Sequence, residues 1–431
     1  MQGTSTSRWV IGLMATLALV CFDTHEKRNA VHPSDTSDAI AEAHPSIVVM
    51  HWLSTGAEAA ALAVVRDRFT SEGGQWRESA MPGVAAANAT SLNRILGGNA
   101  PTVFQVSVGT RLQELGRLGL ISPVGLPTGE WDLMLPPIIA RAAKQGGRYI
   151  ATPIGISGEN WMFYNKAVLA DAGLGVPTSW KEFLVVAEAL SAAGKTPIAL
   201  GGQPWQERIL FNSVLLGVGG RSFYRHIYQQ LDHDAFASDA LLETFRIFGA
   251  LRKFVDRASP GRPWDTATMM LVKGDAAFQF IGDWAKGPIR AAGLEPGNQI
   301  GCTLAPGPDV AYIMAVDAFA MSNSTSPEAI AGQRLFVRTA IDPHVQAAFN
   351  RIRGSIPARL DAPDTGFDTC AKYAMRIIKD PNAQLVSTGL FGLTGGMSGA
   401  IDDAISQFWN DPDLDAKHGK ALFVQSIDAF R

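Results

Sequence analysis

Short apolar runs alternate along this chain with longer stretches of helical character. Strands are expected at 46–52, 102–106, 161–165 and 276–281, with an extended segment at 149–156. Helices are expected at about 57–70 and 180–193, and long helical stretches dominate after Gly366. Strands that alternate with helices are typical of α/β proteins, so the hydrophobic pattern predicts an α/β fold.

The most informative pattern lies around the strand expected at 276–281. A Lys-Gly-Asp turn at 273–275 precedes it, and glycine there accepts the left-handed conformation that ends a helix. Gly282 interrupts the strand, and Asp283 and Trp284 follow. An indole covers the C–H face of a sugar ring, and a carboxylate accepts hydrogen bonds from its hydroxyl groups, so the pair indicates a sugar site. The alternative is that Trp284 belongs to the core and Asp283 caps the next helix.

Two other loops repeat this chemistry at the ends of apolar strands. His51 and Trp52 end the first strand, while Gln203 and Trp205 follow the strand that ends near Leu200. Ligands of open α/β sheets bind outside the carboxyl ends of the strands. We therefore expect the three loops to converge on one sugar-binding site.

Composition narrows the class of protein. A chain of 431 residues suggests two domains of ordinary size. The net charge of -3 gives no electrostatic reason to expect nucleic acid or an anionic membrane as a partner. Ten tryptophans exceed the needs of a core of this size, which agrees with aromatic contacts to a ligand.

The N-terminus indicates export. An apolar run at 9–22 precedes a charged, polar stretch at 23–38, and the run is too short to span a membrane comfortably. We interpret residues 1–30 as a secretory signal, with small-residue cleavage sites at Ala30 and at 41–43 both open. An uncleaved anchor is one alternative. Lipidation at Cys21 is another, but Val20 before it is larger than such sites prefer.

Cysteine usage agrees with export. After removal of the signal, only Cys302 and Cys370 remain. An even pair in an oxidising compartment predicts a disulfide bond between them. The alternative is two buried thiols.

Six motifs spread over the chain together resemble a known family. They are Trp52 with Ser-Thr-Gly-Ala-Glu at 54–58, Arg-Ile-Leu-Gly-Gly-Asn-Ala-Pro at 94–101, Tyr-Asn-Lys at 164–166, Thr-Ser-Trp-Lys-Glu-Phe at 178–183, Gly-Gly-Gln-Pro-Trp-Gln at 201–206 and Phe-Ile-Gly-Asp-Trp-Ala-Lys-Gly at 280–287. The set resembles the family 1 solute-binding proteins of bacterial ABC sugar importers, and above all their periplasmic glucose and mannose binders. The resemblance covers nearly the whole mature chain.

The resemblance implies a type II periplasmic binding protein with two lobes and a hinged cleft between them. The chain would cross between the lobes near 155–157, 279–283 and 312–318. The N-lobe would comprise 45–156 plus 283–315, and the C-lobe 157–282 plus 316–431. The cleft would hold the sugar.

The resemblance also assigns candidate sugar contacts. Trp52 and Glu58 match an aromatic residue and an acid presented by the first strand and helix. Trp205, beside Gln203, matches the stacking platform, and Asp283 matches the hydroxyl-binding carboxylate. We expect Trp205 and Trp52 to stack on the sugar and Trp284 to pack at the hinge.

Three positions depart from the glucose binders. Arg353 stands where they usually carry lysine, and its planar fork binds hydroxyls differently from an ammonium group. Ser107 lies near a position where they tend to carry lysine, and Gly395-Gly396 lies where they tend to carry histidine. The departures at Ser107 and at Gly395-Gly396 weigh against glucose itself and admit a larger or differently substituted sugar.

The functional expectation is a monomeric sugar-binding protein that delivers a mono- or small oligosaccharide to an ABC permease coupled to a cytoplasmic ATPase. No metal or phosphate-binding motif is found in the sequence, and no cofactor is expected. A secreted glycosidase is one alternative, with Glu58 and Asp283 as its acid and base. A sugar-binding protein that serves a chemoreceptor is the other.

Overall fold

The computed structural model describes residues 40, 43–54, 56–308, 311–383, 385–387 and 393–430. The expected signal segment at 1–30, including Cys21, lies outside these residues. Within the described ranges, no helix has both the length and the apolar character needed to cross a bilayer.

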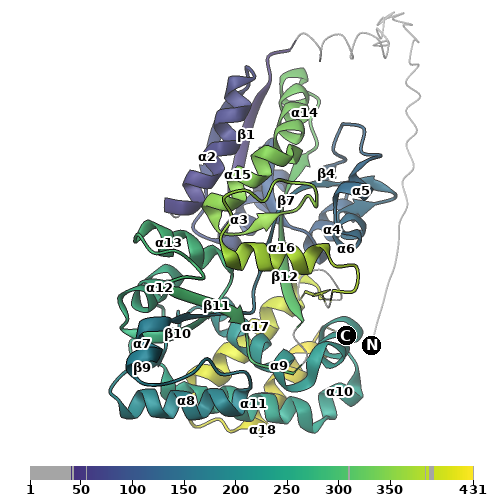
Figure 1. The fold of residues 1–431 in the computed structure, drawn as a ribbon. Helices are drawn as coiled ribbons and strands as arrows, with labels where there is room; N and C mark the ends of the chain where they lie inside the picture. The colour runs from purple at the N-terminus through teal and green to yellow at the C-terminus, as the bar shows by residue number, and fades with distance from the viewer. Residues whose placement is uncertain are drawn as a thin grey trace, which may run out of the picture.

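Two β-sheets organise the chain (Figure 1). The larger sheet has eight strands along the path β13-β7-β12-β3-β1-β2, with β4 and β14 paired to β12. Its strands are β1 (Ser46–His51), β2 (Gln75–Ala80), β3 (Val103–Ser107), β4 (Ile121–Ser122), β7 (Ala151–Gly158), β12 (Tyr312–Ser322), β13 (Ile356–Pro357) and β14 (Leu385–Val386). The smaller sheet, in the order β11-β8-β10-β9, comprises β8 (Trp161–Asn165), β9 (Thr196–Ile198), β10 (Ala276–Ile281) and β11 (Ile300–Leu304), and β5 (Lys144–Gln145) and β6 (Arg148–Tyr149) form a separate ribbon.

Helices cover both sheets, so the predicted α/β fold is confirmed (Figure 1). Around the eight-stranded sheet lie α2 (Gly56–Ser71), α3 (Val84–Leu96), α4 (Thr110–Arg117), α5 (Trp131–Met134), α6 (Pro137–Ala142), α14 (Pro327–Ile341) and α15 (Pro343–Arg353). Around the four-stranded sheet lie α7 (Lys166–Asp171), α8 (Trp180–Ala192), α9 (Pro204–Arg225), α10 (His233–Ala237), α11 (Asp239–Leu251), α12 (Trp264–Lys273), α17 (Gly395–Asn410) and α18 (Ala416–Asp428). Figure 1 shows α13 (Lys286–Ala291) and α16 (Thr369–Lys379) between the two groups.

Local sequence explains where key helices begin and end. Gly274 takes the left-handed conformation with φ of 76° and closes α12, as its Lys-Gly-Asp turn predicted. Ser179 caps α8 by accepting a hydrogen bond from the backbone N–H of Glu182. Pro204 occupies the first turn of α9, where its missing N–H costs no helical hydrogen bond. These signals fix the helix ends that border the second sheet.

The sheets divide the chain differently from the expected lobes. Strand β11, expected in the N-lobe as part of 283–315, pairs with β8 in the four-stranded sheet. Strand β12 pairs antiparallel with β3 and β7, and α14 and α15 pack against β1 and α2, although 316–431 was expected in the C-lobe. The physical reason is that β12 is long enough to pair with β3 and β7 over most of its length, which draws the helices after it onto the eight-stranded sheet.

A group of buried charges lies where the chain passes between the sheets. Asp283, in the 3-10 turn η3 (Asp283–Ala285), is 0% exposed, and its Oδ1 lies 3.3 Å from the Nζ of the equally buried Lys286. Its Oδ2 accepts hydrogen bonds from the Gly158 N–H at 2.7 Å and the Tyr312 hydroxyl at 3.1 Å. Burial raises the pKa of Asp283, and the Lys286 ammonium opposes that shift. One carboxylate therefore joins the end of β7, the start of β12 and η3.

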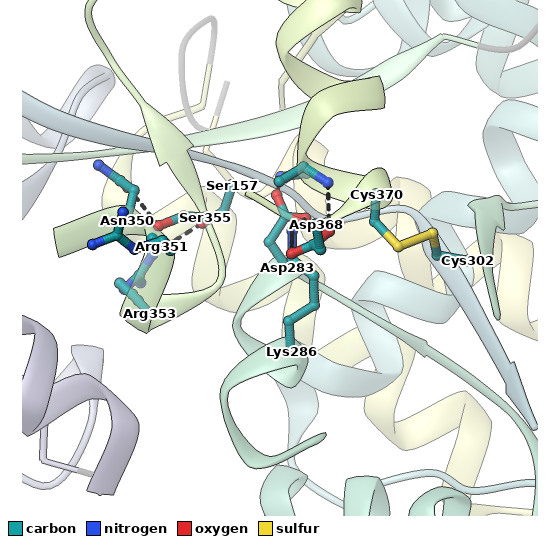
Figure 2. A network of polar contacts seen from close by, with 12 residues as sticks. Ser157, Asp283, Lys286, Cys302, Asn350, Arg351, Arg353, Ser355, Asp368 and Cys370 are labelled. Carbon is teal, nitrogen blue, oxygen red and sulfur yellow. Dashed lines mark hydrogen bonds and ion pairs between the residues drawn. A yellow bond between two sulfur atoms is a disulfide. The ribbon is translucent and has the colours of Figure 1, made fainter. Parts of the chain in front are cut away.

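Asp368 extends this group to α16 (Figure 2). Its carboxylate caps α16 by accepting from the Ala371 N–H at 2.7 Å. The same carboxylate pairs with Arg290 and lies 3.7 Å from the Lys286 Nζ. We call Asp283, Lys286, Arg290 and Asp368 the junction cluster. It connects α13 and α16 to both sheets.

The structure joins Cys302 to Cys370 in a disulfide beside this cluster, with Cα atoms 6.2 Å apart (Figure 2). Cys302 belongs to β11 and Cys370 to the first turn of α16. The cross-link expected from the two remaining cysteines therefore ties the four-stranded sheet to the helix that carries Asp368 at its start.

We expect the non-reduced chain to weigh two hydrogen masses less than the reduced chain, because the Cys302–Cys370 bond replaces two thiols. Replacing both cysteines by serine should lower the free energy of unfolding by about 4 kcal/mol, as expected for a cross-link over a separation of 68 residues. Mass spectrometry and urea denaturation measure these effects. Equal masses before and after reduction would contradict the bond.

Replacing Lys286 by methionine should lower the free energy of unfolding by about 3–5 kcal/mol, because two buried carboxylates lose their shared cation. The matched control is Lys253→Met, which breaks an exposed pair with Glu188 at 2.7 Å and should cost less than about 1 kcal/mol. Chemical denaturation compares the two variants. Equal losses would show that the junction cluster is no more important than a surface pair.

Candidate functional site

Strand register gathers polar side chains around Asp317 of β12. Asp317 lies opposite Ser107 of β3 and Gly155 of β7. Gln105 of β3 donates from its Nε2 to the Asp317 Oδ1 at 3.2 Å and accepts from the Trp52 backbone N–H at 3.2 Å. Asp317 therefore links the carboxyl ends of β1 and β3 to the central strand of the sheet.

Arg353 closes this group from the end of α15. Its Nη2 lies 2.9 Å from the Asp317 Oδ2, and its Nη1 donates to the Ser157 Oγ at 3.0 Å. Arg353 is only 4% exposed, so the two bonds compensate for removing its charge from water. We call Arg353, Asp317 and Ser157 the arginine clamp. It joins α15 to β12 through Asp317 and to β7 through Ser157, and Figure 2 shows the Arg353–Ser157 side of the clamp.

The end of α15 is fixed against β7 by its own hydrogen bonds. Asn350 donates to the Ile154 carbonyl at 2.9 Å and accepts from the Ser355 hydroxyl at 2.6 Å (Figure 2). Gly354 then ends the helix with φ of 102°. A Cβ at Gly354 would lie 2.5 Å from the backbone oxygen of Asp283, so only glycine permits this approach. Arg353 is thereby held next to the junction cluster.

Trp205 lies at the start of α9, with its indole half-buried. Its Nε1 donates to the Gln203 Oε1 at 3.1 Å, and its ring centroid lies 6.0 Å from that of Trp284. Trp284 folds back over Gly282, where a Cβ would lie 2.2 Å from the indole. Two of the three strand-end loops expected to converge therefore meet through their indoles, and Trp284 packs at the point where β10 ends.

Glu58 lies in the first turn of α2 and is largely buried. A Cβ at Gly287 of α13 would lie 2.6 Å from the Ala57 Cβ and 3.6 Å from the backbone oxygen of Arg353. The start of α2 is therefore packed against α13 and the end of α15. Glu58 belongs to the same neighbourhood as the arginine clamp.

The structure places Asp283 and Trp52 deeper than the sequence led us to expect. Asp283, expected to face the cleft or else to cap a helix, is fully buried between Gly158, Tyr312 and Lys286. These contacts enclose its carboxylate within the junction cluster. Trp52, expected to stack on a sugar, is 7% exposed; its backbone N–H donates to Gln105, and its ring packs in the core. The sugar contacts of both residues remain predictions.

Sequence reasoning missed a second charged group near the clamp. Glu159 directly follows β7, and Arg208 of α9 pairs with Asp402 of α17 through an Nε–Oδ1 contact of 2.8 Å. Burial raises the pKa of Glu159; Arg208 opposes that shift, while Asp402 and Asp317 add to it. A charged residue directly after a fully buried strand was the available signal, but its partners are distant in sequence.

Metal chemistry finds no support in this part of the molecule. In the described residues, no group of three or more histidine, cysteine, aspartate or glutamate side chains is arranged to hold a metal ion. The clamp and the aromatic pair instead offer the flat faces and charged hydrogen-bonding groups that suit a polyhydroxyl ligand.

Comparisons with known proteins show which family the chain resembles over its length. The chain is 35% identical to a probable sugar-binding periplasmic protein of Brucella melitensis over 400 residues, which are 91% of this chain and 94% of the relative. It is 33% identical to a protein of the same description from Rhizobium meliloti, over 90% of this chain and 95% of the relative.

Solved structures of sugar-binding proteins have a similar fold. A chitin oligosaccharide binding protein superimposes with a TM-score of 0.76 at 18% identity, covering 89% of this chain and 98% of the other. The maltotriose binding protein of Thermus thermophilus superimposes with a TM-score of 0.67, over 89% of this chain and 100% of the other. The fold is therefore that of the two-lobed, type II periplasmic binding proteins. The bacterial extracellular solute-binding protein family matches residues 70–346, and with relatives of this similarity over nearly its whole length, the chain belongs to that family.

Proposed function

We propose that this protein binds a mono- or small oligosaccharide between its two lobes and delivers it to the permease of an ABC importer. The observation that carries the proposal is the close approach of Gly354, which follows Arg353, to the backbone oxygen of Asp283, which precedes Trp284; this approach brings the ends of the arginine clamp and of the Trp205–Trp284 pair together. Relatives described as probable sugar-binding periplasmic proteins support it. Export through the signal segment at 1–30, action as a monomer and energy from a cytoplasmic ATPase belong to the same proposal.

The chemistry of the two groups suits a neutral sugar. The half-buried Trp205 indole offers a face for ring C–H groups, and Gln203 beside it offers amide hydrogen bonds. The charged atoms of Arg353 and Asp317 bind hydroxyls with roughly 1.5–3 kcal/mol each, so a few contacts are enough for about micromolar affinity. Ser107 is exposed and pairs with Asp317 across β3 and β12, so its hydroxyl is a further candidate hydrogen-bonding group for the sugar.

We assign one lobe to each of the two sheets, with the junction cluster at the hinge between them. The aromatic pair belongs to the side of the four-stranded sheet, and the arginine clamp to the side of the eight-stranded sheet. A sugar that touches both groups binds the closed arrangement better than the open one, and this difference in affinity drives closure. The permease would then distinguish the closed, loaded form.

The geometry favours binding over hydrolysis. A general acid or base must reach the proton that it transfers. Asp283, the partner proposed for Glu58 in a glycosidase, is enclosed by the Gly158 N–H, the Tyr312 hydroxyl and Lys286. The sugar is therefore released unchanged.

Replacing Trp205 by alanine should weaken sugar binding by at least about tenfold, equivalent to about 1.4 kcal/mol, because the ligand loses its aromatic face. Calorimetry with monosaccharides and disaccharides measures the loss, and chromatography of the same mixtures should recover every sugar intact. The matched control is Trp76→Ala: Trp76 is also half-buried, donates to Glu78 at 3.1 Å and lies 6.0 Å from the Phe336 ring. Undiminished affinity in the Trp205 variant, or turnover of a sugar, would refute the assignment.

Replacing Arg353 by lysine should weaken sugar binding by about tenfold, because a compact ammonium cannot hold Asp317 and Ser157 together. Arg359→Lys is the control, since Arg359 pairs with Asp361 through two of its nitrogens but lies outside the clamp. Calorimetry measures affinity, and thermal unfolding shows whether each variant remains folded. A folded Arg353→Lys protein with unchanged affinity would exclude the clamp from the site.

A further inference from the structure

Glu159 continues the face of β7 that carries the arginine clamp. In a paired antiparallel ribbon, opposite residues share a face, and alternate residues along each strand do too. Asp317 lies opposite Gly155, and Ala315 lies opposite Ser157. Glu159 follows Ser157 by two positions, and its N–H donates to the Ile313 carbonyl at 2.7 Å, so the pairing with β12 extends to it. Its side chain therefore lies on the clamp side, displaced toward the four-stranded sheet.

The Arg208–Asp402 pair approaches Glu159 from the other lobe. Arg208 lies three residues after Trp205 in α9, and residues at this spacing share a helix face. The charges of Arg208, Asp402 and Asp317 all act on Glu159. Glu159 is thus close enough to the clamp carboxylate of Asp317 on one side, and to the Arg208–Asp402 pair on the other, for both to act on its charge.

One carboxylate oxygen of Glu159 lacks a hydrogen-bond donor among the described residues. In the part of the chain that the structure describes, its Oε2 is shielded from water and has no hydrogen-bond partner. A buried carboxylate oxygen without a donor is unfavourable. A sugar hydroxyl is a donor that a carboxylate accepts strongly, and hinge opening would give it access.

We propose that Glu159 determines sugar specificity by accepting a hydrogen bond from one hydroxyl of the bound sugar, on the ring edge away from the arginine clamp. The inference rests on the sugar-binding function proposed above and narrows its substrate class to neutral sugars. Asp317, Glu159 and Asp402 place three carboxylates beside two arginines, so the carboxylate of a uronic acid would meet like charge.

The test is calorimetry on the wild type and Glu159→Gln. The ligands are D-glucose, D-galactose, D-mannose, D-xylose, maltose and the uronic acid of each hexose, followed by the monodeoxy analogues of the best ligand. In the wild type, we expect neutral sugars to bind at least about tenfold tighter than the uronic acids, and one deoxy analogue to bind about tenfold weaker than its parent. In Glu159→Gln, the affinity for the best ligand should fall about tenfold. The deoxy analogue that binds the wild type about tenfold more weakly should then bind the variant as well as the best ligand does.

Glu188→Gln is the matched control, because Glu188 is an exposed carboxylate also opposed by a cation, Lys253. It should leave every affinity unchanged. If the wild type bound no sugar at all, the proposed function itself would fall, and this inference with it. If the wild type bound sugars but Glu159→Gln kept the same affinities and the same deoxy penalty, only the role of Glu159 would fall. A uniform loss across the panel with a lower unfolding temperature would show a structural role and would also overturn it.

Discussion

The buried contact between Asp283 and Lys286 is the constraint around which the rest of the site is arranged. Both side chains are withdrawn from water, and the carboxylate also holds the end of β7 and the start of β12. A buried ion pair contributes little to stability when compared with apolar packing, but removing one partner is costly. The ion pair therefore matters here for its position, because Asp283 holds together β7 and β12, two strands that are far apart in the sequence.

The position of the arginine clamp depends on that geometry. Gly354 approaches the backbone of Asp283 so closely that a side chain would not fit, and this contact places Arg353 at the end of α15. Arg353 then reaches Asp317 and Ser157 on neighbouring strands. A polar site assembled from elements so far apart in sequence needs a rigid centre, since small displacements would break hydrogen bonds that have narrow distance limits.

The sequence predicted which strand-end residues lie together better than it predicted how deeply they are buried. Trp205, Gln203 and Trp284 were recognised because an aromatic residue after an apolar strand has few other local explanations, and the structure does bring them together. The burial of Asp283 was missed, although Lys286 lies three residues later, because the same spacing also occurs in exposed turns. Asp317 was missed for a different reason. A charge inside an apolar strand signals a buried partner, but nothing local identifies Arg353 as that partner.

Sheet membership was the least predictable property. The apolar run of β12 is compatible with either sheet, and only its pairing with β3 and β7 decides which one it joins. The same limit applies to β11, whose partner β8 lies far away in sequence. Helix ends were easier to predict from the sequence. Gly274, for example, ends α12 through a local left-handed conformation that depends only on neighbouring residues.

The pairing of β7 with β12 shifts register between Asp317 and Ala318, so the ribbon carries a bulge or irregularity at the residue that binds Arg353. A bulge bends and twists its strand locally, and the added twist changes the direction of the side chains beside it. The irregularity falls at the residue whose carboxylate lies 2.9 Å from the Arg353 guanidinium. The backbone geometry of the ribbon, and not only the choice of side chains, therefore determines how the arginine clamp is oriented.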